Sequence, residues 1–152
     1  MYIVAIKILN SFIWIKIFFY IAWWMNKRVV LKTEFIIRCI YALCLIGAGL
    51  NHLQTVLMHG LFWDYNNAPL FTCIYWTSLT FIDPLAAILL FYRPRIGLVL
   101  TFLIIFSDVI HNTWITLKVG RDLLNYMYIS HFLFLVFVLR TIKLPWKAHK
   151  KS

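Results

Sequence analysis

Seven titratable or amide side chains stand inside the longest apolar stretches of this sequence. They are Asn51, His52, Asp83, Asp108, His111, Asn112 and His131. Carboxyl and imidazole groups relay protons, act as general acid and base, or ligate a cation, and amides hydrogen-bond beside them. Because ionisable groups in membrane-like segments almost always face an interior or a wet cavity, we expect the seven side chains to converge on one binding site.

The spacing of the polar residues supports a common site. Asp108, His111 and Asn112 follow i, i+3, i+4 spacing, which puts them on one face of a helix. Most of the polar groups also fall close to the middle of their apolar stretch. Since a helix rises by about 1.5 Å per residue, the sequence predicts a polar layer near the middle of a bilayer.

Several chemistries use these residue types, and the sequence leaves them open. A proton or cation path would use the Asp and His side chains as relay groups. A membrane enzyme acting on a lipid-like substrate would use the same groups as general acid and base. A zinc or iron site would combine histidines with a carboxylate, and a bis-histidine haem would pair His52 with His111 or His131. No helix carries an H-x-x-x-H or E-x-x-H cluster, so no cofactor is assigned, and haem and metal stay as alternatives.

The alternative to a binding cavity is a structural polar layer. Hydrogen bonds between membrane helices contribute about 0.6 kcal/mol per pair and fix the register of neighbouring helices. The protein would then be an interaction protein, such as an assembly subunit or an immunity factor. Ser or Asn would suffice for that purpose. The Asp and His residues of this layer therefore favour a cavity that binds a small or lipid-like ligand, a proton or a cation.

Asp83 and Pro84 permit two local structures. Pro84 lacks an amide hydrogen and frees the carbonyl of Thr80, so the helix can kink and continue. Alternatively, Asp83 caps a new half-helix that starts at Pro84 and ends at Tyr92. We expect the first, because membrane helices often absorb a proline.

The composition places these stretches in a membrane. The 152 residues are 63% hydrophobic and 13% charged, whereas a soluble domain averages about 25% charged residues. Crossing the hydrocarbon takes about 20 apolar residues. Four stretches qualify: Cys39–Trp63, Leu70–Phe91, Gly97–Leu117 and Leu123–Leu139. We therefore predict that residues 1–152 form a single integral membrane domain, an all-α multi-pass transmembrane helical bundle.

A fifth helix is predicted over Ile8–Trp24. Its central Lys16 costs about 2.5 to 3.5 kcal/mol in a bilayer, and we expect it to be the counter-ion of one of the two buried Asp residues. The rival interpretation starts the native chain at Met25, because a short basic N-terminus orients a first helix; the bundle then has four helices. The predicted segments are 1–25 with the extra helix, 26–143 with a core four-helix bundle, and 144–152 with a basic tail.

The net charge of +10 comes from basic residues that predict the orientation. Eleven Lys and Arg residues fall on one side of the predicted spans, and only Lys118 and Arg121 fall on the other. The basic side, with the C-terminus, is predicted to be cytoplasmic in a bacterial inner membrane and to contact anionic lipid headgroups. The tail is too short and too close to the membrane to indicate nucleic-acid binding. A homo- or hetero-oligomer is left open.

Two families share features with this sequence. The Asp83–Leu85 stretch, the His and Asp residues at the midplane and the basic tail resemble the emopamil-binding and sterol-isomerase group of four-helix membrane proteins. That resemblance implies a membrane enzyme. The predicted spans contain no Glu, where that group carries catalytic acids, so no catalytic residue is transferred. In size, basicity and helix count, the chain is also similar to small immunity proteins of bacterial inner membranes.

Overall fold

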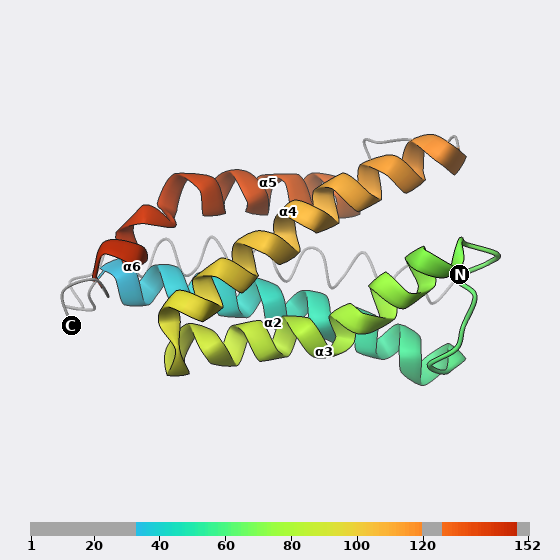
Figure 1. The fold of residues 1–152 in the computed structure, drawn as a ribbon, viewed down its shortest axis with the longest axis horizontal. Coiled ribbons are helices and arrows are strands. Elements are labelled where there is room, and N and C mark those ends of the chain that lie inside the picture. The colour runs from blue at the N-terminus through green and yellow to red at the C-terminus, as the bar shows by residue number, and fades with distance from the viewer. Residues whose placement is uncertain (1–32, 120–125, 149–152) are drawn as a thin grey trace. The chain divides into compact units, whose positions relative to one another are not determined.

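The structure, a computed structural model, describes residues 33–119 and 126–148, and every regular element within these ranges is helical (Figure 1). The long helices are α2 over Thr33–His59, α3 over Leu70–Tyr92, α4 over Pro94–Val119 and α5 over Tyr126–Thr141, followed by the short α6 over Lys143–Ala148. Four segments, the last running from α5 through α6, are long and apolar enough to cross a membrane. The all-α prediction with transmembrane helices is confirmed at this level. The predicted fifth helix over Ile8–Trp24 lies outside the described residues.

The helices form where the apolar stretches are, but their ends are set by local chemistry. α2 is described from Thr33, six residues before the predicted Cys39, and its first described turn contains Glu34. It ends at His59 because Gly60 takes a left-handed φ of 85° and its N–H donates to the carbonyl of Val56 at 2.8 Å. The basic segment after Thr141 forms α6, and its Pro145 is buried.

α3 continues through Pro84 as one helix from Leu70 to Tyr92. The discontinuous alternative, with Asp83 as the cap of a new half-helix, is therefore wrong. Pro84 has no amide hydrogen, so the carbonyl of Thr80 receives no hydrogen bond from the residue four positions later. Gly49 of α2 lies against this point. A Cβ on Gly49 would sit 3.1 Å from Cδ of Pro84 and 3.3 Å from Cβ of Asp83.

Only Arg93 separates α3 from α4. Its N–H donates to the carbonyl of Leu89 at 2.9 Å, and Pro94 then starts α4, a position where its fixed φ suits a helix. Gly97 allows the two helix backbones to touch, because a Cβ there would lie 2.4 Å from the backbone N of Leu90. The connection from Arg93 to Arg95 is thus a tight corner, and helix α4 begins immediately after Arg93.

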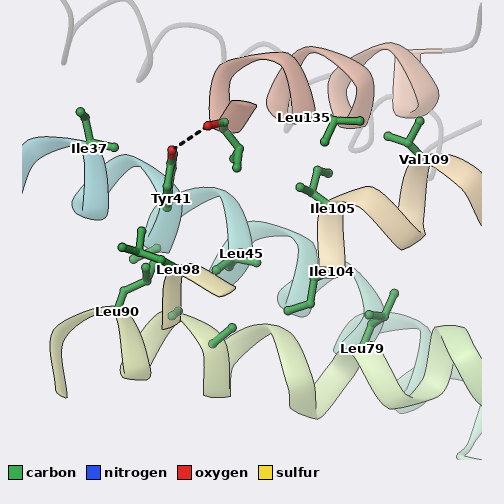
Figure 2. Packing of buried hydrophobic residues seen from close by; sticks show 14 residues of the cluster. Ile37, Tyr41, Leu45, Leu79, Leu90, Leu98, Ile104, Ile105, Val109 and Leu135 are labelled. Atoms are coloured by element: carbon green, nitrogen blue, oxygen red, sulfur yellow. Dashed lines mark hydrogen bonds between the residues drawn. The ribbon is translucent and has the colours of Figure 1, made fainter. Parts of the chain in front are cut away.

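The core lies where α2, α3 and α4 meet α5, and Figure 2 shows its packed side chains. α4 runs obliquely from the corner with α3 toward α5 (Figure 1). The buried apolar residues include Ile37, Tyr41 and Leu45 of α2, Leu79 and Leu90 of α3, Leu98, Ile104, Ile105 and Val109 of α4, and Leu135 and Val138 of α5. Many apolar side chains point outward, among them Ile88, Leu103, Phe106 and Leu133, as a lipid-facing surface requires.

One polar contact ties α2 to α5 inside this core. The Tyr41 side chain is 0% exposed, and its hydroxyl lies 2.7 Å from Oγ1 of Thr141. The same hydroxyl lies 3.4 Å from the carbonyl of Val138, a contact drawn as a dashed line in Figure 2. Because Thr141 donates its own hydroxyl hydrogen to the carbonyl of Phe137 at 2.6 Å, Tyr41 is the donor to Thr141. The tyrosine ring also packs edge-on against Phe137 at 5.7 Å.

Removing this hydroxyl tests whether α5 docks on α2 as described. Tyr41→Phe is expected to lower the free energy of unfolding by about 1 kcal/mol, because one buried hydrogen bond is lost and the ring packing is kept. Reversible unfolding in detergent would measure it. In a double-mutant cycle with Thr141→Val, the two losses should overlap. Losses that simply add would show that the two side chains do not interact.

The end of α3 is held by Arg38 of α2. Its guanidinium donates to the carbonyl of Leu90 at 3.1 Å and lies 5.7 Å and 5.9 Å from the ring centroids of Phe35 and Phe91. A cation at a helix C-terminus complements the dipole and the unpaired carbonyls there. The N-terminal part of α2 and the C-terminal part of α3 therefore lie at the same end of the structure.

Candidate functional site

Asp108 lies near the middle of α4 and is only 3% exposed. Its Oδ1 accepts a hydrogen bond from the hydroxyl of Tyr75 on α3 at 2.9 Å. The Tyr75 hydroxyl also lies 2.9 Å from the hydroxyl of Ser107, and Ser107 donates to the carbonyl of Ile104 at 2.9 Å. One oxygen of the buried carboxyl group is therefore bound into a hydroxyl network between α3 and α4.

The other oxygen of Asp108 faces His131 of α5. Nε2 of His131 lies 3.6 Å from Oδ2 of Asp108, an ion-pair distance. The second ring nitrogen, Nδ1, lies 2.7 Å from the carbonyl of Met127, one turn earlier in the same helix. Because a carbonyl oxygen only accepts hydrogen bonds, Nδ1 carries a hydrogen. The helix backbone thus fixes the tautomer and orientation of the ring that meets Asp108.

This geometry favours a proton shared by Asp108 and His131. A neutral His131 with its hydrogen on Nδ1 would direct the Nε2 lone pair at the carboxylate, and that arrangement is repulsive in a buried site. Adding one proton makes the contact attractive, either as imidazolium with carboxylate or as imidazole with carboxylic acid. The pair is therefore a proton-binding unit.

The hydroxyl network accommodates the same proton on its own side. Tyr75 and Ser107 have one hydroxyl hydrogen each, but three contacts join them to Asp108, to each other and to the carbonyl of Ile104. A hydrogen on Oδ1 of Asp108 would complete a chain from Asp108 to Tyr75, from Tyr75 to Ser107, and from Ser107 to Ile104. Asp108 thus lies between His131 on one side and the Tyr75 and Ser107 hydroxyl groups on the other. A proton on Asp108 can be hydrogen-bonded to either side.

Asp83 is a second buried carboxyl group, within electrostatic reach of Asp108 and of Tyr75. It is 0% exposed, and neither of its oxygens has a hydrogen-bond partner in the part of the chain that the structure describes. Thr80, one turn earlier on α3, is also buried, and its hydroxyl has no partner among the same residues. Two carboxylates cannot both be ionised so close together without nearby positive charge.

His52 of α2 completes the group, since it lies within electrostatic reach of His131 and is partly buried. The structure thus brings together four of the seven side chains singled out in the sequence: His52, Asp83, Asp108 and His131. They come from four different helices, α2, α3, α4 and α5. Their role in binding stays a prediction.

His111 is buried in an aromatic cluster instead. Its ring lies 4.5 Å from that of Tyr75, and it also packs against Phe71, Trp76 and Trp114 at 5.6 to 5.9 Å between centroids. Its Nε2 has no hydrogen-bond partner among the described side chains and backbone. His111 adjoins the Asp108 site through the ring of Tyr75.

The two amides do not contact these four side chains in the described residues. Asn51 is exposed, and its backbone carbonyl accepts a hydrogen bond from the hydroxyl of Thr55 at 3.2 Å. Asn112 is partly exposed on α4. Lys16, the expected counter-ion, lies outside the described residues.

Sequence reasoning did not single out Tyr75 or Ser107, and it named Thr80 only beside Pro84. Tyr75 lies eight residues before Asp83 on α3, about two turns of helix. Ser107 adjoins Asp108 in sequence, and Thr80 precedes Asp83 by one turn. Spacing from the two Asp residues was the available signal.

Metal and haem sites were left open by the sequence. In the described ranges 33–119 and 126–148, no group of three His, Cys, Asp or Glu side chains is placed to hold a metal ion. The Asp108 site instead combines one carboxyl, one imidazole and two hydroxyl groups, a set suited to holding and moving a proton.

Comparison with known proteins found no match to any protein family, curated protein or solved structure. In the described ranges 33–119 and 126–148 the fold is helical, with four helices long and apolar enough to cross a membrane. What that protein does must be argued from the chemistry of the site.

Proposed function

We propose that the protein moves protons within or across the membrane through the site formed by Asp108, His131 and Tyr75. The observation that carries the proposal is the contact between His131 and Asp108, in which the Met127 carbonyl holds the ring so that its second nitrogen faces the carboxyl group. Intramembrane carboxyl and imidazole groups commonly serve as proton relays. A structural polar layer needs no such titratable pair.

The steps of a transfer follow the hydrogen-bond directions. His131 is 18% exposed at its side chain and Asp108 only 4%, so His131 is the group that exchanges protons with the surroundings. It passes its Nε2 proton to Oδ2 of Asp108. With the proton on Oδ1, Asp108 donates to the hydroxyl of Tyr75 on α3, Tyr75 donates to Ser107 on α4, and Ser107 donates to the carbonyl of Ile104, where the hydrogen bonds of the described residues end. When Asp83 is ionised, its negative charge makes the loss of the proton from Asp108 less favourable.

A multi-pass arrangement is part of the proposal. Four or five helices cross a bacterial inner membrane as a bundle, with the C-terminus in the cytoplasm and the basic residues on anionic headgroups. The position of Arg38 beside the end of α3 supports it, because antiparallel spans must bring these two ends together. At the opposite end, Trp63 stacks on His59 at 4.0 Å and Tyr65 packs on Trp76 at 5.2 Å, as in an interfacial aromatic belt.

Proton flux into vesicles tests the function. Purified protein is reconstituted with a pH-sensitive dye inside, and a potassium diffusion potential drives protons inward. His131→Gln is expected to reduce the flux at least about tenfold, because Gln cannot carry a proton between solvent and Asp108. His59→Gln is the matched control, since His59 is an exposed histidine at the end of α2 that stacks on Trp63, away from the site.

The same assay separates the alternatives. Wild-type vesicles that conduct no more than empty vesicles would contradict proton movement and favour an interaction protein whose polar layer sets helix packing. Equal flux in wild type and His131→Gln would contradict the assigned path. Inactive His131→Gln protein must elute as folded protein in size-exclusion chromatography for its result to count.

A further inference from the structure

Thr80 and Asp83 form an oxygen-rich buried site on α3 that the proton path does not use. Both side chains are more than nine-tenths buried, and their oxygens have no hydrogen-bond partner among the described residues. They are three positions apart, so they are neighbours on one helix face. Burial of polar oxygen without a partner is costly, and two such groups side by side indicate a ligand that supplies positive charge.

A third oxygen comes from the backbone. Because Pro84 has no amide hydrogen, the carbonyl of Thr80 lacks its usual donor within the helix. Gly49 of α2 faces the same point, where its missing Cβ leaves α2 close to the side chains of Asp83 and Pro84. The site therefore offers three oxygen donors from one turn of α3, namely the Asp83 carboxylate, the Thr80 hydroxyl and the Thr80 carbonyl.

The ligand chemistry follows from donor type and charge. Oxygen donors alone suit a hard cation and give no nitrogen or sulfur ligand for zinc or copper. Asp83, Asp108 and a protonated His131 together carry one net negative charge, so a monovalent cation neutralises the cluster. Backbone carbonyls released within membrane helices coordinate Na⁺ in other settings.

We propose that Asp83, the Thr80 hydroxyl and the Thr80 carbonyl bind a sodium ion. This inference rests on the proposed function in one respect, the proton held by the Asp108–His131 pair, which leaves that pair without net charge. Sodium at Asp83 would couple to that pair through electrostatics, since the two carboxyl groups lie within reach of each other.

Thermal stability of the full-length protein in detergent tests the site. Unfolding is followed in NaCl and in N-methylglucamine chloride at equal ionic strength. A ligand that binds only the folded state raises Tm with its concentration. Saturating Na⁺ is expected to raise Tm by on the order of 5 °C in the wild type, not at all in Asp83→Asn, and by less in Thr80→Val.

Thr72→Val is the matched control. Thr72 is on the same helix, is 0% exposed, and also has an unpartnered hydroxyl among the described residues, but it is three turns away from Asp83. The increase in Tm that Na⁺ causes in Thr72→Val should equal the increase in the wild type. Equal stability of the wild type in the two salts, or a Na⁺ shift that survives in Asp83→Asn, would overturn the sodium site.

The vesicle assay keeps the two proposals apart. If Na⁺ has no effect on Tm while His131→Gln still abolishes proton flux, the sodium site is wrong and the proton path stands, with Asp83 held neutral by a proton. If Na⁺ stabilises the protein but vesicles conduct no protons, the proposed function is wrong and the cation site stands.

Discussion

Asp108→Asn is expected to abolish proton flux while leaving the protein folded. The amide oxygen can still accept the hydrogen bond from Tyr75, and the amide NH₂ can donate to the Nε2 lone pair of a neutral His131. The amide cannot take up a proton, so the path is interrupted at its centre. Flux in vesicles should fall to the level of empty vesicles, and the unfolding midpoint in detergent should stay within a few degrees of the wild type.

Comparison of Asp108→Ala with Asp108→Asn separates the loss of the hydrogen bonds of Asp108 from the loss of its ability to take up a proton. Ala leaves the Tyr75 hydroxyl without its acceptor and His131 without its partner, and each unsatisfied buried group costs about 1 to 3 kcal/mol. We therefore expect a large loss of stability in addition to loss of flux. Wild-type flux through Asp108→Asn would show that the carboxyl group carries no protons, and the proton path would have to be abandoned.

Gly97→Ala is expected to be the most destabilising single-methyl substitution in the described helices. The added Cβ would lie 2.4 Å from the backbone N and 2.6 Å from Cα of Leu90. Backbone atoms cannot move aside as a side-chain tip can, so α3 and α4 must separate at the corner. Overpacking typically costs about 1 to 3 kcal/mol, and we expect this site to reach or exceed the upper value. Yield of folded protein after extraction, and unfolding in denaturant, would measure it.

Two other glycines serve as controls for Gly97. Gly49→Ala meets Cδ of Pro84 at 3.1 Å, which can be relieved by a shift of tenths of an ångström, so a smaller loss is expected. Gly60→Ala meets no atom within 4 Å but has to hold a φ of +85°, which costs about 1 to 2 kcal/mol for an L-residue. If Gly97→Ala were the mildest of the three, the tight α3–α4 corner would be wrong.

The helices were predictable because a bilayer needs long apolar segments. Each of the four predicted stretches overlaps one observed helix, and the described part of α2 starts at Thr33, before the predicted Cys39. Asp83 and Pro84 left two local structures open. Only the packing of α2 against α3 through Gly49 shows how a helix carries both residues in its middle.

The site was predictable in part. Burial of ionisable groups in apolar segments indicated that Asp108 and His131 have partners, and the structure places the two in contact, whereas Asp83 has no hydrogen-bond partner among the described residues. The contact between Asp108 and Tyr75 was less predictable, because it depends on the rotation of α3 against α4. Spacing put His111 on the face of Asp108, yet one turn of helix is enough to move it among aromatic rings.

Nitrogen-15 NMR of the His131 ring in lipid vesicles reports on the proton between Asp108 and His131. With ring-labelled histidine and His131→Gln protein to assign the signal, Nδ1 is expected to bear a hydrogen at every pH at which the protein is folded. Nε2 is expected to show a shared or full proton that changes in Asp108→Asn. A ring with its hydrogen on Nε2 and a bare Nδ1, or a spectrum that Asp108→Asn leaves unchanged, would contradict the proton-binding pair.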